Sequence, residues 1–303
     1  MKTIVPDYYP EFHCIAGSCR HSCCIGWEID IDEDTRQLYR EIPGEIGRRL
    51  SEQIDDSGEI SCFRLDQRER CPFLNEEGLC DIILQLGEGA LCQICSDHPR
   101  FRSFFSDRTE MGLGLCCEAA ADLILRRTEP VRLTVLENDG ETEPLTDWER
   151  TVLAEREACI RLAQDRTLSA KDRMERIASL PPYSFARWTE ILLELEQMAP
   201  AWSELLRRAA GNDVCAAVSD LAAEQLLVYF LFRHLPDAVD SDDLRARAAF
   251  AVVSTQLITG LAARLPETDI REIARLYSSE IEYSEENTEA LLAVLRDSAD
   301  AFR

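Results

Sequence analysis

Eleven of the thirteen cysteines lie within the first 117 residues of this 303-residue chain, and this clustering constrains the fold more than any other feature. Only Cys159 and Cys215 lie beyond it. Thirteen cysteines are too sparse here for a small secreted domain held together by disulfides. In a reducing compartment, clustered thiols are more often metal ligands or catalytic groups. The sequence therefore predicts a cysteine-rich, metal-binding domain over 1–127 and a cysteine-poor domain over 128–303.

Ten of the eleven cysteines of the first domain fall into three closely spaced groups, and Cys62 lies between the first and the second. The groups are Cys14, Cys19, Cys23 and Cys24; then Cys71, Cys80, Cys92 and Cys95; then Cys116 and Cys117. Thiolates prefer soft or borderline metals, so an iron–sulfur cluster and Zn²⁺ are both candidates. Only Cys92 and Cys95 have the spacing usual for zinc, and the other gaps are irregular. Gly26 stands where a Cys-x3-Cys-x2-Cys radical motif would need its third cysteine, which argues against that enzyme type.

Short elements separated by turns are expected in the first domain. A helical pattern over 34–53 is interrupted at Pro43-Gly44, and a further helix is expected over 118–127. Cys71–Cys80 resembles two short strands around a turn that contains Gly78. Other strands are expected at 60–65, 102–105, 111–115 and 131–137.

From residue 145 onward the hydrophobic periodicity is helical throughout. Thr146 and Glu149 form a capping box before the first helix, and Pro181-Pro182 and Gly211-Asn212 interrupt the pattern. The helices are expected at 147–166, 170–180, 185–198, 200–210, 213–235, 242–264, 269–281 and 285–302. Helices joined by short connections predict an all-α second domain. The predicted fold class is therefore mostly α, with small β elements confined to the cysteine-rich region.

The acidic charge balance restricts the partners. Asp and Glu number 57 against 33 Lys and Arg, a formal net charge of −24. Nucleic acids and anionic membranes are therefore not expected to bind, and a cationic partner is the natural opposite. The longest uncharged run, 248–263, is too short and too polar to span a membrane and predicts a buried helix. Since no apolar signal segment follows Met1, we expect a cytoplasmic protein.

Four segments together carry a family resemblance. They are CIAGSCRHSCCIGWEIDID from Cys14, CPFLNEEGLC from Cys71, Cys95 followed by His98-Pro99-Arg100, and LGLCCEAAADLIL from Leu113. In combination they resemble the flagellin lysine-N-methylase family, whose cysteine pattern is shared with small iron- or zinc-chelating proteins. The resemblance covers about residues 8–127 closely. In the helical half only LLVYFLFRHL, from Leu226 to Leu235, is similar.

This resemblance implies a cofactor, a substrate and a set of metal ligands. The family is associated with an iron–sulfur cluster, most simply 4Fe-4S with zinc as the alternative, and with methyl transfer from S-adenosylmethionine to surface lysines of flagellin. The implied ligands are Cys14, Cys19, Cys23, Cys24, Cys71, Cys80, Cys95 and Cys116. The remaining cysteines are particular to this chain: Cys62, Cys92, Cys117, Cys159 and Cys215.

Lysine methylation sets its own requirements on the site. A neutral amine must attack the sulfonium methyl in line, although free lysine has a pKa of about 10.4. Carboxylates beside the amine would raise its pKa. Acidic side chains that attract the substrate are therefore expected at the rim of the site, and the methyl-transfer pocket itself should be apolar or aromatic. The glycine-rich turn of a Rossmann methyltransferase is missing. The residues do not identify the catalytic or donor-binding groups.

Two other classes of function remain open. One is a non-enzymatic binding module whose zinc site only stabilises the fold. The other is a thiol redox or metal-delivery protein with reactive cysteines. A methyltransferase predicts saturable S-adenosylmethionine binding, a zinc-stabilised module predicts colourless protein with bound zinc, and a redox protein predicts reversible bleaching of a visible band.

Overall fold

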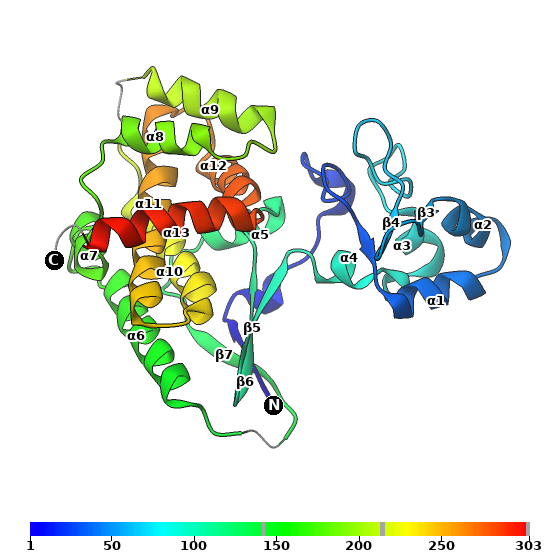
Figure 1. Ribbon diagram of the computed structural model, residues 1–303, viewed down its shortest axis with the longest axis horizontal. Coiled ribbons are helices and arrows are strands. Elements are labelled where there is room, and N and C mark those ends of the chain that lie inside the picture. The colour runs from blue at the N-terminus through cyan, green and yellow to red at the C-terminus, as the bar shows by residue number, and fades with distance from the viewer. Residues whose placement is uncertain (141–142, 213–215, 301–303) are drawn as a thin grey trace. The chain divides into compact units, whose positions relative to one another are not determined.

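The computed structural model describes residues 1–140, 143–212 and 216–300. It divides the chain into two compact units (Figure 1). The cysteine-rich unit is 13–100, and the helical unit combines 1–12 with 101–303. These bounds differ from the predicted division at residue 127. The reason is long-range strand pairing, because β1 (Lys2–Pro6) joins a sheet of the helical unit.

The cysteine-rich unit is built from short elements around a small aromatic core. Its antiparallel sheet has the order β2-β4-β3 (Asp30–Ile31, Ser61–Phe63, Ile54–Asp55). The helices are α1 (Glu33–Glu41), α2 (Gly44–Glu52), α3 (Asp81–Leu86) and α4 (Gln93–Asp97). Phe63 lies between Tyr39 and Phe73 in the core, with ring centroids 6.3 and 5.1 Å away. The predicted break at Pro43-Gly44 is confirmed. At 71–80, however, turns and an isolated bridge between Leu74 and Cys80 replace the two expected strands.

The helical unit carries a four-stranded mixed sheet of order β5-β6-β1-β7. These strands are β5 (Arg100–Phe105), β6 (Arg108–Leu113), β1 and β7 (Leu133–Asn138). The expected hairpin through 106–107 is confirmed as β5–β6. β1 runs parallel to β6, with Lys2 opposite Arg108, and antiparallel to β7. This sheet accounts for the N-terminal residues that sequence spacing had assigned to the other domain.

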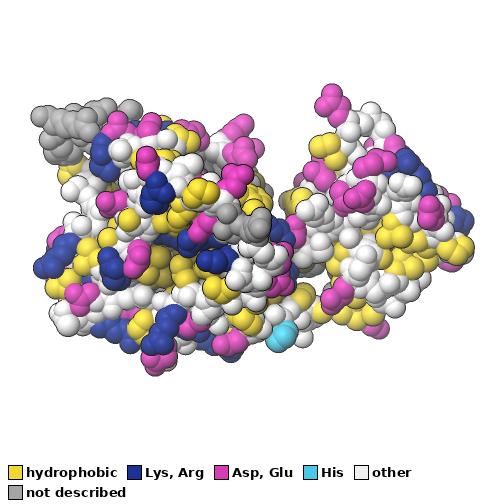
Figure 2. Space-filling model, turned by 90° about the horizontal axis from the view of Figure 1, so that it is seen from below, with side chains coloured by type: hydrophobic (Ala, Val, Ile, Leu, Met, Phe, Trp, Pro, Cys, Tyr) yellow, Lys and Arg dark blue, Asp and Glu magenta, His cyan; other side chains and the backbone are white. Residues whose placement is uncertain are grey.

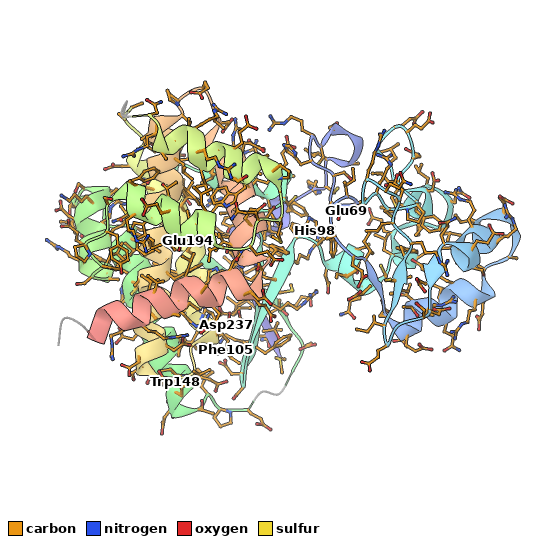
Figure 3. The ribbon with its side chains drawn as sticks, turned by 45° about the horizontal axis from the view of Figure 1, so that its top comes forward. Glu69, His98, Phe105, Trp148, Glu194 and Asp237 are labelled. Carbon is orange, nitrogen blue, oxygen red and sulfur yellow. The ribbon has the colours of Figure 1, made fainter. Side chains whose placement is uncertain are left out.

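Helices make up the rest of this unit. They are α5 (Glu118–Leu125), α6 (Asp147–Ala163), α7 (Ala170–Ile177), α8 (Phe185–Glu194), α9 (Pro200–Ala210), α10 (Asp220–His234), α11 (Ser241–Arg264), α12 (Ile270–Tyr277) and α13 (Glu285–Asp300). A π-helix, Ser278–Glu282, follows α12 directly. α10 and α11 pack along each other at the centre, and α13 packs on α11 (Figure 1). On α6, Trp148 Nε1 donates to the carbonyl oxygen of Ala238 at 2.8 Å, beside Asp237 (Figure 3).

The mostly α fold class is confirmed, and most helix bounds agree with the expected ones. α8 ends four residues early, and the expected 269–281 helix ends as a π-helix. For the expected helix 213–235, residues 213–215 lie outside the described part and α10 begins at Asp220.

α11 is the one helix in the described part of the chain that is long and apolar enough to cross a membrane. However, 72% of its apolar window is buried inside the protein. Phe250, for example, is fully buried and meets Phe230 of α10 edge-on, with centroids 6.3 Å apart. The uncharged run over 248–263 therefore forms a core helix, as predicted.

Figure 2 shows acidic side chains spread over one face of the protein, with arginines among them.

The capping box predicted at the start of α6 is present, and its contribution to stability can be measured. Thr146 Oγ1 accepts a hydrogen bond from Glu149 N at 3.2 Å, and Glu149 Oε2 accepts one from Thr146 N at 2.7 Å. We expect Thr146→Ala to lower the free energy of unfolding by about 1 kcal/mol, because one backbone donor loses its partner. Chemical denaturation measures this change. An unaltered unfolding free energy would show that the cap contributes nothing.

Candidate functional site

Five thiols gather in the core of the cysteine-rich unit, and backbone contacts explain how. Cys71 N donates to the carbonyl oxygen of Cys24 at 2.9 Å, which joins the first cysteine segment to the second. Leu74 N donates to the carbonyl oxygen of Cys71 at 3.1 Å, and Leu74 bridges to Cys80. The turn through 75–79 therefore folds Cys80 back toward Cys71.

The other two thiols belong to the first turn of α4. Cys92 is the N-cap residue, and Cys95 N donates to its carbonyl oxygen at 3.1 Å. Asp32 holds this turn in place, because its Oδ2 accepts from Gln93 N at 2.8 Å while Oδ1 accepts from Thr35 N of α1 at 2.9 Å. We call Cys24, Cys71, Cys80, Cys92 and Cys95 the five-thiol group.

Burial distinguishes members of the five-thiol group. Cys71 and Cys92 are 6% and 1% exposed and belong to the aromatic core. Cys24, Cys80 and Cys95 are half-buried and pack against that core. Such thiols are shielded from water on one side only, which suits ligands of a centre at the edge of the core.

The thiols also perturb one another electrostatically. A hydrogen bond from Cys23, helped by Ser22, outweighs burial and lowers the pKa of Cys24 to about 7. Burial raises the pKa of Cys71 to about 12, with contributions from the charges of Cys24, Cys80 and Cys92. The side chains of Cys92 and Cys95 hydrogen-bond, which lowers the pKa of Cys92 and raises that of Cys95. The five-thiol group therefore behaves as one interacting set.

The five-thiol group fits a soft metal by its chemistry. None of the described cysteines forms a disulfide. Over 1–140, 143–212 and 216–300, no three Cys, His, Asp or Glu side chains are arranged to hold a metal ion. The donors are therefore present and near one another, but without ligating geometry. We assign metal binding to them only as a proposal, below.

The predicted ligands are distributed unequally. Cys24, Cys71, Cys80 and Cys95 lie in the five-thiol group. Cys23 adjoins it through its hydrogen bond to Cys24, although neighbouring thiols usually point apart. Cys14 is exposed, and its sulfur accepts from Ala16 N at 3.4 Å, while Cys19 is half-buried on the same segment. Cys116 belongs to the helical unit.

Cys92 lies in the five-thiol group although it is not among the ligands that the resemblance implies. It was set apart as particular to this chain, yet it is the most deeply buried member of the five-thiol group. Its two-residue spacing from Cys95 was the signal that could have identified it.

A second polar site lies in the helical unit, around Arg233. Tyr229, Arg233 and His234 project from the last turns of α10, and Glu282 ends the π-helix. Tyr229 OH donates to Glu282 Oε2 at 2.9 Å and accepts from Arg233 Nη1 at 2.8 Å. His234 Nε2 lies 2.7 Å from Glu282 Oε1, and Arg233 Nε lies 3.3 Å from the same oxygen.

Tyr283 and Cys116 complete this Arg233 network at its outer side. Their side chains hydrogen-bond, and burial raises the pKa of the Cys116 thiol to about 12. Burial also raises the pKa of Glu282, but the charge of Arg233 and the hydrogen bond from His234 outweigh it and keep this pKa below its ordinary value. A π-helix inside a helical segment often marks a functional site. The sequence signal was three polar residues within the apolar stretch LLVYFLFRHL: Tyr229, Arg233 and His234.

Four aromatic residues beside the cysteine segments are candidates for the wall of a methyl-transfer pocket: Tyr8, Tyr9, Trp27 and Phe73. Of these, Tyr8 and Phe73 belong to the two cores. Tyr8 is 3% exposed and Phe73 is fully buried. Tyr8 lines a small apolar cavity with Tyr229 and Phe232, which has room for about one water molecule. This cavity is too small for a methyl donor.

His234 gives a pH prediction. Burial, the largest effect, lowers its pKa below the ordinary value of about 6.5 despite its contact with Glu282. The folded state therefore favours neutral His234, so this contribution to stability is complete above about pH 6.5 and is lost as the pH falls toward the lower folded pKa. We expect His234→Gln to show a shallower loss of unfolding free energy on acidification than the wild type. Identical pH slopes would contradict this account.

The fold and these sites define a class of protein: a mostly helical chain with a separate thiol-rich unit. Within the described residues it has no doubly wound sheet of the Rossmann type. Curated proteins named lysine-N-methylase from Salmonella typhimurium and Salmonella choleraesuis are each 27% identical to it over 249 residues. A flagellar biosynthetic protein FliU from Salmonella muenchen is 28% identical over 136 residues, or 42% of this chain and 79% of that protein. These matches confirm the resemblance predicted from the cysteine motifs.

The extent of these matches bears on function. The lysine-N-methylase alignments cover 76% of this chain. The part of the chain outside the alignments is shorter than either structural unit. The similarity therefore includes residues of both units. The chain spans 61% of the length of these two relatives. No family model matches the chain. No solved structure matches it either.

Proposed function

We propose that this chain is a protein-lysine N-methyltransferase that acts on flagellin with S-adenosylmethionine as the methyl donor. The observation that carries this proposal is the similarity to lysine-N-methylases across both units. The similarity to FliU supports a flagellar context. We propose the cytoplasm as its location, since free thiols persist in a reducing compartment.

We also propose that the cysteine-rich unit holds an iron–sulfur cluster, most simply 4Fe-4S, with zinc as the alternative. The five-thiol group supports this assignment, because it supplies free, partly buried soft ligands in one small core. Four of its members were among the predicted ligands, and Cys92 is the addition. When bound, such a centre would cross-link the first cysteine segment, the turn at 71–80 and α4.

The net charge suits a basic substrate segment. A protein of charge −24 attracts lysine-rich surfaces, which raises the rate of encounter. The amine must then lose its proton before it attacks the methyl group, so it has to leave the acidic rim for a site without carboxylates. In the Arg233 network the Glu282 carboxylate is fully buried and paired, so it is not available to an incoming amine.

Methyl transfer is tested directly with purified components. The anaerobically purified chain is incubated with S-adenosylmethionine carrying a labelled methyl group and with flagellin. We expect label on flagellin lysines and none on flagellin whose lysines have been acetylated beforehand. A chain that binds its full metal complement and still transfers no label would contradict the proposal.

A further inference from the structure

The Arg233 network contains hydrogen-bond donors that its own residues do not use. Arg233 reaches Glu282 through Nε and Tyr229 through Nη1. No acceptor among the described residues takes a hydrogen bond from Nη2. The Arg233 side chain is nevertheless only 12% exposed, so its charge is held in a largely dry position. A charge-assisted hydrogen bond is stronger in such a place than in water.

Other groups converge on the same guanidinium. It lies over the rings of Phe101 and Tyr283, at 4.9 and 5.2 Å from their centroids. Gly114 packs closely against this point, because a β-carbon there would lie 2.9 Å from the Tyr283 hydroxyl, 3.1 Å from Arg233 Nη1 and 3.3 Å from the Cys116 sulfur. Three groups able to donate hydrogen bonds therefore meet within one small region.

This region is accessible, and the carboxylate within it is already paired. Tyr283 is 47% exposed, and Cys116 is half-buried beside it. Glu282 is fully buried, and its two oxygens already serve Tyr229, His234 and Arg233. The outer edge of the network thus presents a cation beside the Tyr283 hydroxyl and the Cys116 thiol. The hydrogen bond between these two groups uses one of their protons and leaves the other for a ligand. That combination recognises a carboxylate.

A purely structural role explains the network less well. A buried ion pair contributes little net stability, because desolvation of both charges offsets their attraction. Well-packed apolar side chains would stabilise this helix junction at least as well. A π-helix that ends on the paired carboxylate also points to function.

We propose that Arg233, with Tyr283 and Cys116, binds the carboxylate of the methyl donor's amino-acid end. This inference rests on the proposed function, since it takes S-adenosylmethionine as the ligand. It gives Arg233 a binding role on the donor, and it gives Glu282 and His234 the role of positioning Arg233.

Decarboxylated S-adenosylmethionine is the probe that tests this directly, because it keeps the sulfonium, the adenosine and the amine and lacks only the carboxylate. Binding of both compounds to the intact, metal-loaded chain is measured by titration calorimetry. We expect the wild type to bind S-adenosylmethionine at least about tenfold more tightly than the decarboxylated compound, the value of one charge-assisted hydrogen bond.

Variants identify the residue responsible. Arg233→Met combined with Glu282→Gln removes both charges, so that no buried charge is left unpaired. We expect this double variant to lose the preference for S-adenosylmethionine and to bind the decarboxylated compound as tightly as the wild type does. Tyr283→Phe changes one partly exposed hydroxyl and is expected to reduce the preference in part. The matched control is Arg275→Met, since Arg275 is 11% exposed and pairs with Glu272 at 2.7 Å.

The outcomes separate this inference from the function on which it rests. Equal binding of both compounds by the wild type, or a preference that survives in the double variant, would overturn the carboxylate site and leave the methyltransferase proposal standing. A wild type that binds neither compound would overturn the proposed function, and this site with it. Should the double variant fail to fold, the wild-type preference and Tyr283→Phe still decide the matter.

Discussion

Replacing Cys92 with serine is expected to remove most of the bound metal from the anaerobically purified chain. Cys92 is the most buried of the five thiols, and its sulfur hydrogen-bonds to that of Cys95. Serine preserves the shape of the side chain but is a poor ligand for the soft metals that thiolates select. Iron and zinc per chain, together with the visible spectrum, measure the effect. About four irons with a brown colour would identify the cluster, and colourless protein with zinc the alternative.

Cys159 provides the matched control for this experiment. It is half-buried and lies on α6 of the helical unit, where burial raises its pKa to about 11. We expect Cys159→Ser to keep the full metal content. A Cys92→Ser protein with as much metal as the wild type would remove Cys92 from the ligand set. The eight cysteines implied by the family resemblance would then remain the candidates.

Breaking the ion pair between Arg156 and Glu110 is expected to cost about 3–5 kcal/mol of unfolding free energy. Arg156 Nη2 donates to Glu110 Oε1 at 2.8 Å, its Nη1 donates to the other oxygen, and the two side chains are 4% and 1% exposed. Arg156→Met leaves a buried carboxylate without a partner, which is the origin of the cost. Removing both charges with Arg156→Met and Glu110→Leu should restore most of the loss. Denaturant unfolding measures both variants.

Arg161 supplies the control on the same helix. Its ion pair with Glu157 is as short, at 2.8 Å, but both side chains are 69% exposed. Solvent screening makes such a pair worth little, so Arg161→Met should change the unfolding free energy by less than about 0.5 kcal/mol. Equal losses for Arg156→Met and Arg161→Met would contradict the role given to burial.

Local sequence signals predicted most of the helical unit. Three successive helices, α6, α7 and α8, each have the hydrogen bond expected of an N-cap. The capping residues are Thr146, Ser169 and Ser184. These signals work because a cap involves residues only a few positions apart. The start of α11 shows the limit of such reasoning, since the expected range was 242–264 and the helix begins at Ser241 with Asp240 as its N-cap.

The domain division and the sites depended on contacts between distant residues. β1 pairs with residues more than one hundred positions away, which cysteine density does not indicate. The place of Cys92 in the five-thiol group follows from Asp32, which joins the first turn of α4 to the first turn of α1. The Arg233 network joins residues 114–116, α10 and the π-helix, so its burial and its charge balance are visible only once these elements are packed together.

The central claim, that this chain methylates flagellin lysines, is tested most directly by the mass of flagellin itself. Flagellin is produced in a host without related methylases, alone or together with this chain, and its intact mass and lysine peptides are measured. The account predicts mass increases in whole methyl steps, located on lysines, only when the chain is present. Flagellin of unchanged mass beside folded, metal-loaded chain would contradict it.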